Sequence, residues 1–303
     1  MQLPYFYFAS LVLVFTACIG RSQEIRQPLL DGQLTFAVVG DYGNDSSAEA
    51  AVARLVESWQ VDFVATVGDN NYNEGSATTI DQNIGKYYHS FIGSYTGKFG
   101  AGSATNRFYP ALGNHDWEGL SCEATCAGPY LEYFQLPNNE RYYEVQIGNV
   151  GLFVLDSDPR EPDGISPDSQ QALWLRERLA ASRATHKLVL LHHPPYSSGV
   201  IHGSHDALQW PFEAWGATAV FAGHEHNYER LQVGSLPYFV NGLGGTKSYP
   251  FGLPLTTSQF RYNKEKGAML VVVDADTITY QFVNVQGNLI DSFVQATPTG
   301  QAQ

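Results

Sequence analysis

Five apolar segments of this 303-residue chain each run directly into side chains that can ligate a metal ion. The segments are residues 34–39, 61–67, 108–112, 187–191 and 218–222. The polar residues that follow them and have ligand chemistry are Asp41, Asp69, Tyr72, Asn114, His192, His224 and His226. One Gly-Asp after a strand suits an ordinary turn, but five such endings indicate a common site at one edge of a sheet.

The candidate ligands comprise two carboxylates, one phenol, one amide and three imidazoles. Imidazole suits zinc and iron, whereas carboxylate oxygen suits harder cations. Seven ligands are too many for one ion, but they suffice for two ions if one carboxylate bridges them. Two cations about 3.5–4 Å apart can clamp the attacking and leaving oxygens of a phosphate. The pattern therefore predicts a dinuclear centre directed at phosphate esters.

Tyr72 narrows the choice of metals. A phenol has an unperturbed pKa of about 10, so it is a poor ligand unless the cation is a strong Lewis acid. Fe(III) meets that condition much better than Zn(II), Mn(II) or Mg(II). The sequence therefore favours Fe(III) at one position and a divalent ion, which is Fe, Zn or Mn, at the other.

The elements around these segments predict how the site is built. The strand at residues 34–39, a helix over 47–59 and the strand at 61–67 form a β-α-β unit, which implies parallel pairing. Ser166, Pro167 and Asp168 predict a capped helix that runs to about Ala181. Further along, residues 269–294 alternate like antiparallel strands.

In chain order, the blocks GDYG, GDNNY, GNHD, VLLH and GHEH resemble the five-block signature of the purple acid phosphatases. These enzymes belong to the calcineurin-like metallophosphoesterases, and the chain is similar to their short, mammalian type. The resemblance covers about residues 34–295. It implies an α/β or α+β class with four layers, in which two packed mixed β-sheets are flanked by helices.

The resemblance also implies a role for each ligand. It assigns Fe(III) to Asp41, Tyr72 and His226. It assigns the divalent ion to Asn114, His192 and His224. It makes Asp69 the bridge between the two ions.

Two further histidines match family residues outside the ligand set. The resemblance implies that His115 and His202 contact the phosphoryl group, with His205 as a nearby alternative to His202. We expect Asp116 to orient His115 and Glu225 to face away from the metals. The implied activity is an acid phosphatase that hydrolyses phosphate monoesters with a metal-bound hydroxide as nucleophile.

Two other functions remain open at this stage. A di-metal phosphodiesterase or nucleotide hydrolase of the same superfamily is the nearer one, although many of those enzymes carry Asp-x-His where this chain has Asp41 and Gly43. The other is a secreted, non-catalytic phosphate- or metal-binding protein, whose mark would be a lost ligand. No ligand position is missing here.

Composition and charge limit the partners. The chain is 44% hydrophobic and has a formal net charge of −13. Such a surface repels polyanions, so we expect no nucleic acid. It would also repel small phosphorylated ligands unless something strongly positive lies in the site, and the two predicted cations would supply that charge. With them, the expected partners are small phosphorylated substrates. We also expect a monomer.

The first residues of the chain predict export, and the rest of the sequence predicts a single catalytic domain over residues 32–297. Residues 1–20 resemble a signal peptide, with a lipoprotein signal at Cys18 or a retained membrane anchor as alternatives. Export would make the protein secreted, periplasmic or cell-surface, with contact to a membrane only through a lipid on Cys18. Residues 21–31 are predicted to be a linker and residues 298–303 a tail. In an exported protein Cys122 and Cys126 favour a local disulfide over a metal site.

Overall fold

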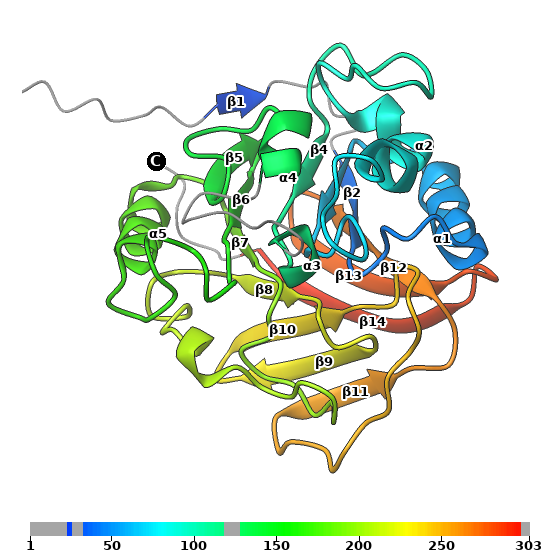
Figure 1. Cartoon of the computed structure of the whole chain (residues 1–303). Helices are drawn as coiled ribbons and strands as arrows, with labels where there is room; N and C mark the ends of the chain where they lie inside the picture. The colour runs from blue at the N-terminus through cyan, green and yellow to red at the C-terminus, as the bar shows by residue number, and fades with distance from the viewer. Residues whose placement is uncertain (1–22, 26–32, 118–127, 298–303) are drawn as a thin grey trace, which may run out of the picture.

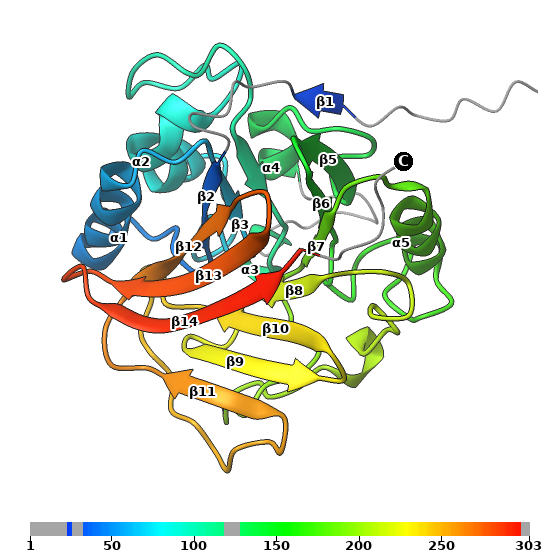
Figure 2. The same cartoon turned by 180° about the vertical axis from the view of Figure 1, so that it is seen from behind.

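Two mixed β-sheets lie face to face in the computed structural model, which describes residues 23–25, 33–117 and 128–297 (Figure 1). The six-stranded sheet has the order β14-β13-β12-β2-β3-β4. Its strands are β2 (Leu34–Val39), β3 (Phe63–Thr66), β4 (Phe108–Pro110), β12 (Gly267–Val273), β13 (Thr277–Asn284) and β14 (Leu289–Ala296). The first three are parallel, and β12 to β14 continue the sheet antiparallel, as expected for the tail (Figure 2).

The eight-stranded sheet has the order β1-β5-β6-β7-β8-β10-β9-β11. Its strands are β1 (Gln23–Ile25), β5 (Tyr143–Ile147), β6 (Val150–Val154), β7 (His186–Leu190), β8 (Ala219–Ala222), β9 (Tyr228–Val233), β10 (Leu236–Asn241) and β11 (Ser258–Tyr262). Strands β6, β7, β8 and β10 are parallel, so the chain segments that follow β6, β7 and β8 emerge at the same edge.

Alternation along the strands divides the apolar residues between two cores. In β7, Leu188 and Leu190 belong to the core between the sheets. Val189 and Leu191 point the other way, into the core under helix α5. Because successive side chains of a strand point to opposite faces, the eight-stranded sheet is buried on both sides.

Helices cover the outer faces of the two sheets, and Figure 1 shows α1 and α5 on opposite sides of the molecule. The longer ones are α1 (Ser47–Ser58) and α5 (Gln170–Ala181). Short helical segments are Asp81–Gly85, α2 (Lys86–Tyr88), His89–Phe91, α3 (Asn114–Trp117), α4 (Gly128–Tyr133) and Asp206–Leu208. The predicted four-layer fold is confirmed.

The predicted start of α5 is wrong. Ser169 caps the helix, because its side chain accepts a hydrogen bond from the backbone N–H of Ala172 at 3.2 Å. Ser166 donates its hydroxyl to Asp168 instead. Both serines suit a cap, but only the side chain that meets an unpaired N–H of the first turn serves as one.

Several expectations for the termini lie outside the described residues. These are the leader at residues 1–20 with Cys18, the Cys122–Cys126 pair and the tail at 298–303. Within the expected linker, β1 pairs in parallel with β5. Among the described residues, no helix combines the length and apolar character needed to cross a membrane.

Candidate metal centre

The five predicted strand ends converge on one cluster, although they come from two sheets. Strands β2, β3 and β4 of the six-stranded sheet lead to Asp41, Asp69 and Asn114. Strands β7 and β8 of the eight-stranded sheet lead to His192 and His224. The side chains of Asp41, Asp69 and His192 are buried and offer ligand atoms that all lie within 4.8 Å of one another.

Tyr72 points into this cluster rather than to solvent. Its hydroxyl donates to Oδ2 of Asp69 at 2.7 Å and lies 3.3 Å from Nε2 of His226. The same Nε2 atom is 3.3 Å from Oδ1 of Asp41. These contacts form one half of the centre.

His192 organises the other half. Its Nε2 atom lies 3.1 Å from Oδ1 of Asn114 and 3.2 Å from Nδ1 of His224. It also lies 3.3 Å from Oδ1 of Asp69. The two carboxylate oxygens of Asp69 therefore face different halves, which is the placement that a shared ligand needs.

The backbone is strained at three of these positions. Asp41, Asp69 and His224 have φ angles of 56°, 54° and 66°. Residues other than glycine seldom adopt this left-handed conformation. Those that do are found mainly at functional sites, where the surrounding structure enforces the strained backbone. Here it turns each side chain back towards the cluster as its strand ends.

Backbone carbonyls fix the orientation of two imidazoles. Nδ1 of His192 lies 2.8 Å from the carbonyl of Val67, and Nδ1 of His226 lies 2.8 Å from the carbonyl of Lys247. A carbonyl can only accept, so each Nδ1 carries a proton and each Nε2 atom faces the cluster. Ligating histidines are commonly held in this way.

The electrostatics of the cluster fit cations. Burial disfavours a charged His192, but the Asp69 carboxylate outweighs burial and raises the pKa of His192 to about 10. Burial lowers the pKa of His224, and the positive charge of His192 lowers it further. A proton on His192 can therefore balance the charge of Asp69, while His224 stays unprotonated and keeps its lone pair. Cations between these acceptors would serve all of them, so the buried Asp and His cluster can bind metal ions.

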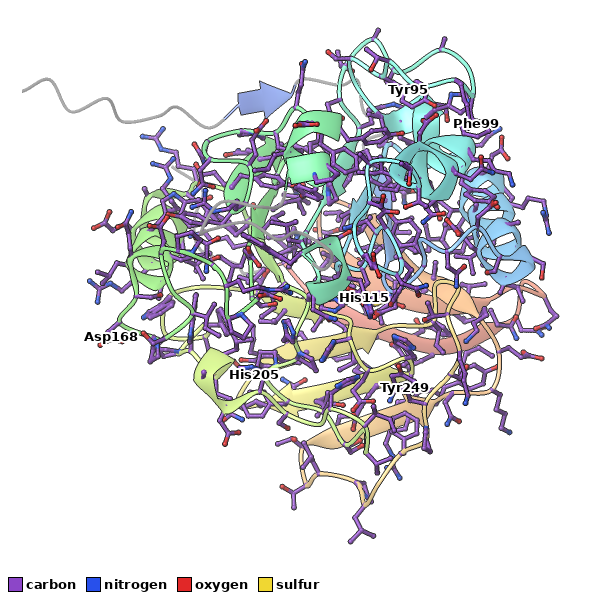
Figure 3. The ribbon with its side chains drawn as sticks, viewed as in Figure 1. Tyr95, Phe99, His115, Asp168, His205 and Tyr249 are labelled. Carbon is purple, nitrogen blue, oxygen red and sulfur yellow. The ribbon has the colours of Figure 1, made fainter. Side chains whose placement is uncertain are left out.

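The two predicted catalytic histidines border the cluster on different sides. His115 rests on the ring of Tyr72, with 4.4 Å between ring centroids, and its Nδ1 lies 2.7 Å from the carbonyl of Asn73. His202 rests on His224 at 3.8 Å between centroids. The alternative, His205, packs against His193 with 5.5 Å between ring centroids, and Figure 3 labels it together with His115 and Tyr249.

The expectation that Asp116 orients His115 is wrong. The Asp116 carboxylate accepts from the backbone N–H groups of Gly113 and Asn70 and from the Asn70 side chain at 2.8 Å. It therefore supports the loops that carry Asn114 and Asp69. Glu225, as expected, turns away from the cluster, and its carboxylate accepts from the backbone N–H of His202 at 2.6 Å.

Sequence reasoning missed two supporting hydroxyls. Ser157 lies 2.9 Å from Nδ1 of His193, and it accepts from the backbone N–H groups of His192 and His193. Thr246 bonds the carbonyl of Asp41 and lies 3.0 Å from Nδ1 of His226. The position of Ser157 could have been noticed, since Leu-Asp-Ser-Asp directly follows β6, a sixth apolar strand.

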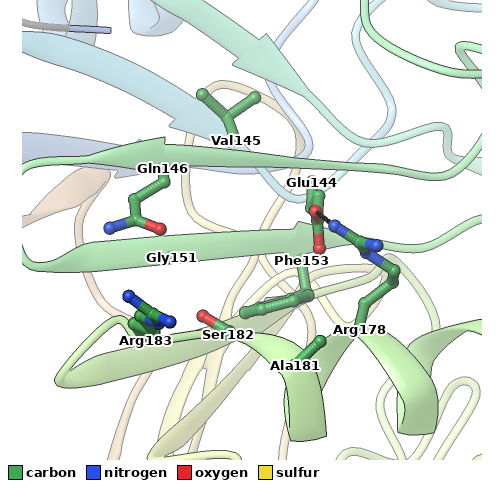
Figure 4. A pocket seen from close by; sticks show the side chains of 9 residues that line it. All are labelled: Glu144, Val145, Gln146, Gly151, Phe153, Arg178, Ala181, Ser182 and Arg183. Carbon is green, nitrogen blue, oxygen red and sulfur yellow. Dashed lines mark hydrogen bonds and ion pairs between the residues drawn. The ribbon is translucent and has the colours of Figure 1, made fainter. Parts of the chain in front are cut away.

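A cavity of about 240 Å³ lies apart from this cluster, between α5 and strands β5 and β6 (Figure 4). Glu144 and Arg178 form an ion pair at its wall, and Phe153, Ser182 and Arg183 also line it. None of the candidate ligands contributes to this cavity. Its charged groups are largely paired with each other, and it adds nothing to the chemistry of the cluster.

A family profile of the calcineurin-like phosphoesterases matches residues 17–228. The chain is 25% identical to human tartrate-resistant acid phosphatase type 5, over 90% of this chain and 95% of that protein. The solved purple acid phosphatase PPD1 of yellow lupin seeds has a TM-score of 0.69 at 18% identity, over 86% of this chain and 53% of that one. GAP50, the anchor in the inner membrane complex of Plasmodium, has a TM-score of 0.67 at 18% identity, over 89% and 90%. The two solved structures show the fold alone.

Proposed function

The chain belongs to the calcineurin-like phosphoesterase family, and from that premise we propose that it is an acid phosphatase acting on small phosphate monoesters. Hydrolysis transfers the phosphoryl group to water, breaks the ester P–O bond and returns a proton to the leaving oxygen. The cluster offers buried side chains, some anionic and some neutral, that can act as ligands for cations. Those cations would bring positive charge to a site in a chain whose net charge is −13.

The proposed division of the ligands follows the two halves of the cluster. Fe(III) would be held by Asp41, Tyr72 and His226, and Asp69 would be shared. The divalent ion, Fe, Zn or Mn, would be held by Asn114, His192 and His224. When bound, such a pair supplies Lewis acidity that neutralises phosphoryl oxygens and acidifies water.

The environment of Tyr72 is the observation that carries this proposal. Its hydroxyl contacts Asp69 and His226, so a phenol takes a ligand position in the first half. A histidine two residues after Asp41 would have no room, because a Cβ on Gly43 would lie 1.6 Å from the backbone oxygen of Asn70. The site therefore fits the phenolate-containing type better than the Asp-x-His phosphodiesterases.

Each of the flanking histidines has a separate task. His115, resting on Tyr72, faces a phosphoryl group from the first half of the centre. His202, resting on His224, faces it from the second half. When protonated, each ring has an N–H group that can donate to a phosphoryl oxygen and return the proton to the leaving oxygen.

Metal analysis combined with visible absorption tests the proposal. We expect one iron and one divalent ion per chain, together with a phenolate-to-Fe(III) absorption band. Tyr72→Phe should remove this band because it deletes the phenolate. Tyr249→Phe is the matched control, since the Tyr249 ring stacks on His226 at 4.0 Å but its hydroxyl makes no contact with a candidate ligand in the described structure.

Turnover completes the test. We expect phosphate monoesters to be hydrolysed faster than diesters at acidic pH. A colourless protein that carries both metals and prefers diesters would show a phosphodiesterase. A protein that binds phosphate but hydrolyses neither class would show a binding function.

A further inference from the structure

A short ribbon beside the cluster is held rigidly and displays apolar side chains to solvent. One strand of the ribbon is residues 197–204, here called the strap, and the other is the facing loop, residues 246–253. The strands pair antiparallel at Gly199 and Phe251. The backbone N–H of Gly252 donates to the carbonyl of Ser198 at 2.8 Å, which joins the two.

Two buried glutamates fasten the strap from below. Glu225 accepts from the backbone N–H groups of His202 and Gly203 at 2.6 and 2.7 Å. Glu229 accepts from both the backbone N–H and the hydroxyl of Ser198 at 2.7 Å. Hydrogen bonds to a buried carboxylate are among the stronger ones in proteins, so the strap has a fixed position.

A glycine makes this fastening fit. A Cβ on Gly199 would lie 2.1 Å from the carboxyl carbon of Glu225, so no other residue allows the strap to approach the glutamate this closely. The facing loop is fixed as well, because the backbone N–H of Tyr249 donates to the carbonyl of His226 at 2.9 Å.

One end of the ribbon forms part of the site. His202 of the strap rests on His224, and Tyr249 of the facing loop stacks on His226 with 4.0 Å between centroids and 12° between planes. The rings of His202 and Tyr249 are themselves 5.8 Å apart. On this side of the cluster, the organic group of a bound phosphate ester would therefore contact the rings of His202 and Tyr249.

The ribbon exposes three large apolar side chains. Val200, Ile201 and Leu253 are 53%, 51% and 90% exposed. A Cβ on Gly252 would lie 2.9 Å from Cγ1 of Val200, so Val200 lies against the facing loop. The other exposed large apolar residues of the described chain are Leu173, Leu289 and Val294, none of which is in the ribbon. An exposed apolar group on a rigid support beside a site typically marks a binding surface.

We propose that this ribbon is the wall that receives the organic group of the substrate, and that the preferred substrates are phosphate monoesters of aromatic or other apolar alcohols. The proposal rests on the proposed phosphatase function. Val200 lies two residues from His202, a span of at most about 7 Å along an extended chain. An aromatic group joined to the phosphate can reach from the rings of His202 and Tyr249 to this side chain.

The test compares two aryl esters that differ in apolar area, naphthyl phosphate and phenyl phosphate. In the variant Val200→Ser with Ile201→Ser, the ratio of kcat/KM for naphthyl over phenyl phosphate should fall about 3- to 10-fold. The matched control is Leu289→Ser with Val294→Ser, which removes two apolar residues of 55% and 56% exposure from β14. The control should keep the wild-type ratio, and both variants should keep the wild-type Tm because all four sites are exposed.

Binding measurements separate this proposal from the proposed function. Calorimetry with naphthylmethylphosphonate and methylphosphonate measures the same preference without turnover. If the variant Val200→Ser with Ile201→Ser binds naphthylmethylphosphonate with a smaller preference over methylphosphonate, the wall is supported. This holds even if the protein hydrolyses no ester, and in that case only the proposed phosphatase function is wrong. Hydrolysis of both esters with an unchanged ratio would overturn the wall and leave the phosphatase standing. If the ribbon instead binds a second copy of the chain, the wild-type protein should be a dimer and the variant Val200→Ser with Ile201→Ser a monomer. The ratio of kcat/KM for the two esters would then be unchanged, and the wall would be overturned.

Discussion

The two sheets supply different chemistry to the centre. The six-stranded sheet, through the loops after β2, β3 and β4, contributes all the candidate oxygen ligands: Asp41, Asp69, Tyr72 and Asn114. The eight-stranded sheet, through the loops after β7 and β8, contributes all the candidate nitrogen ligands: His192, His224 and His226. Neither sheet alone offers a mixed donor set, so the centre exists only where the two sheets pack together.

Bonds between the two sides hold that arrangement. The His192 imidazole contacts the carbonyl of Val67, which follows β3. The backbone N–H of His224 lies 3.0 Å from both carboxylate oxygens of Asp41. Each side therefore positions a ligand of the other, and damage to one side should be felt at both metals.

Asp69→Asn should give the largest effect, because Asp69 is the oxygen ligand that faces both halves. The amide keeps the shape but loses the charge that balances two cations. We expect kcat/KM for phenyl phosphate to fall at least about 10³-fold. Metal content, measured by mass spectrometry, should fall from a pair of ions per chain to at most one.

Asp62→Asn is the control for that experiment. Asp62 precedes β3 at the opposite end of the strand, where its carboxylate accepts from the backbone N–H of Thr35 at 2.7 Å. This variant should keep both metals. If Asp69→Asn also retained a full pair of ions, the idea of a ligand shared between the two sides would be wrong.

The supports behind the two sets of ligands also differ, and a pair of variants measures the difference. On the oxygen side, the buried Asn70 side chain accepts from Tyr42 and Thr66 and donates to Asp116 and a backbone carbonyl. On the nitrogen side, Ser157 bonds two backbone N–H groups and one imidazole. Asn70→Ala leaves several buried polar groups without their hydrogen-bond partner, so it should lower the free energy of unfolding by about 3–5 kcal/mol.

Ser157→Ala should cost less, about 1–2 kcal/mol, because fewer groups lose their partner. Its main effect should be about a 10-fold loss of affinity for the divalent ion, through a less firmly held His192. Denaturant unfolding and metal titration measure the two quantities. Ser166→Ala, at a surface serine whose hydroxyl donates to Asp168, serves as the control. Equal stability losses for Asn70→Ala and Ser157→Ala would contradict the comparison.

The convergence of the candidate ligands could be predicted from the sequence because each of their positions is encoded locally. A buried strand that ends in Gly-Asp or His is visible in a few residues, and parallel strands bring their ends to one edge. The division of those strands between two sheets could not be predicted, since it depends on pairing between distant segments. For example, β2 pairs with β12, more than two hundred residues away.

The supporting residues were harder to predict for a related reason. Asp116 stands beside His115 in the sequence, yet its carboxylate bonds Asn70. Ser157 follows a strand like the others, but serine alone carries no ligand signal. The role of such a residue depends on which backbone groups lie near it after the sheets pack, and neighbours in the sequence do not reveal this.

Buried glutamates repeat the contrast between the two sides on a smaller scale. Glu225 and Glu229 hold the strap on the nitrogen side. On the oxygen side, Glu49 of α1 holds the loop after β2, where it accepts from the backbone N–H groups of Asn44 and Asp45 at 2.9 and 2.6 Å. Its other carboxyl oxygen is buried and has no hydrogen-bond partner among the described residues. Burial raises the pKa of Glu49 to about 9, although the two N–H groups oppose the shift.

Glu49→Gln should therefore change the pH dependence of stability and little else. In the unfolded chain Glu49 ionises at a pKa of about 4.3, whereas in the folded protein it keeps its proton up to about pH 9. Its contribution is fully present below the unfolded pKa and is lost as pH rises through this window, by up to about 1.4 kcal/mol per pH unit. Glutamine still accepts both N–H groups and has no charge to bury.

We accordingly expect equal free energies of unfolding for wild type and Glu49→Gln near pH 4, and a more stable variant at pH 8, by on the order of 1–3 kcal/mol. Urea unfolding of the metal-loaded proteins at both pH values measures this difference. Any pH dependence of metal binding is common to the two proteins and cancels in the comparison. Activity should not change, because Glu49 contacts no ligand. Parallel pH curves would mean that Glu49 is ionised in the folded protein, so that a charged carboxylate holds the loop after β2.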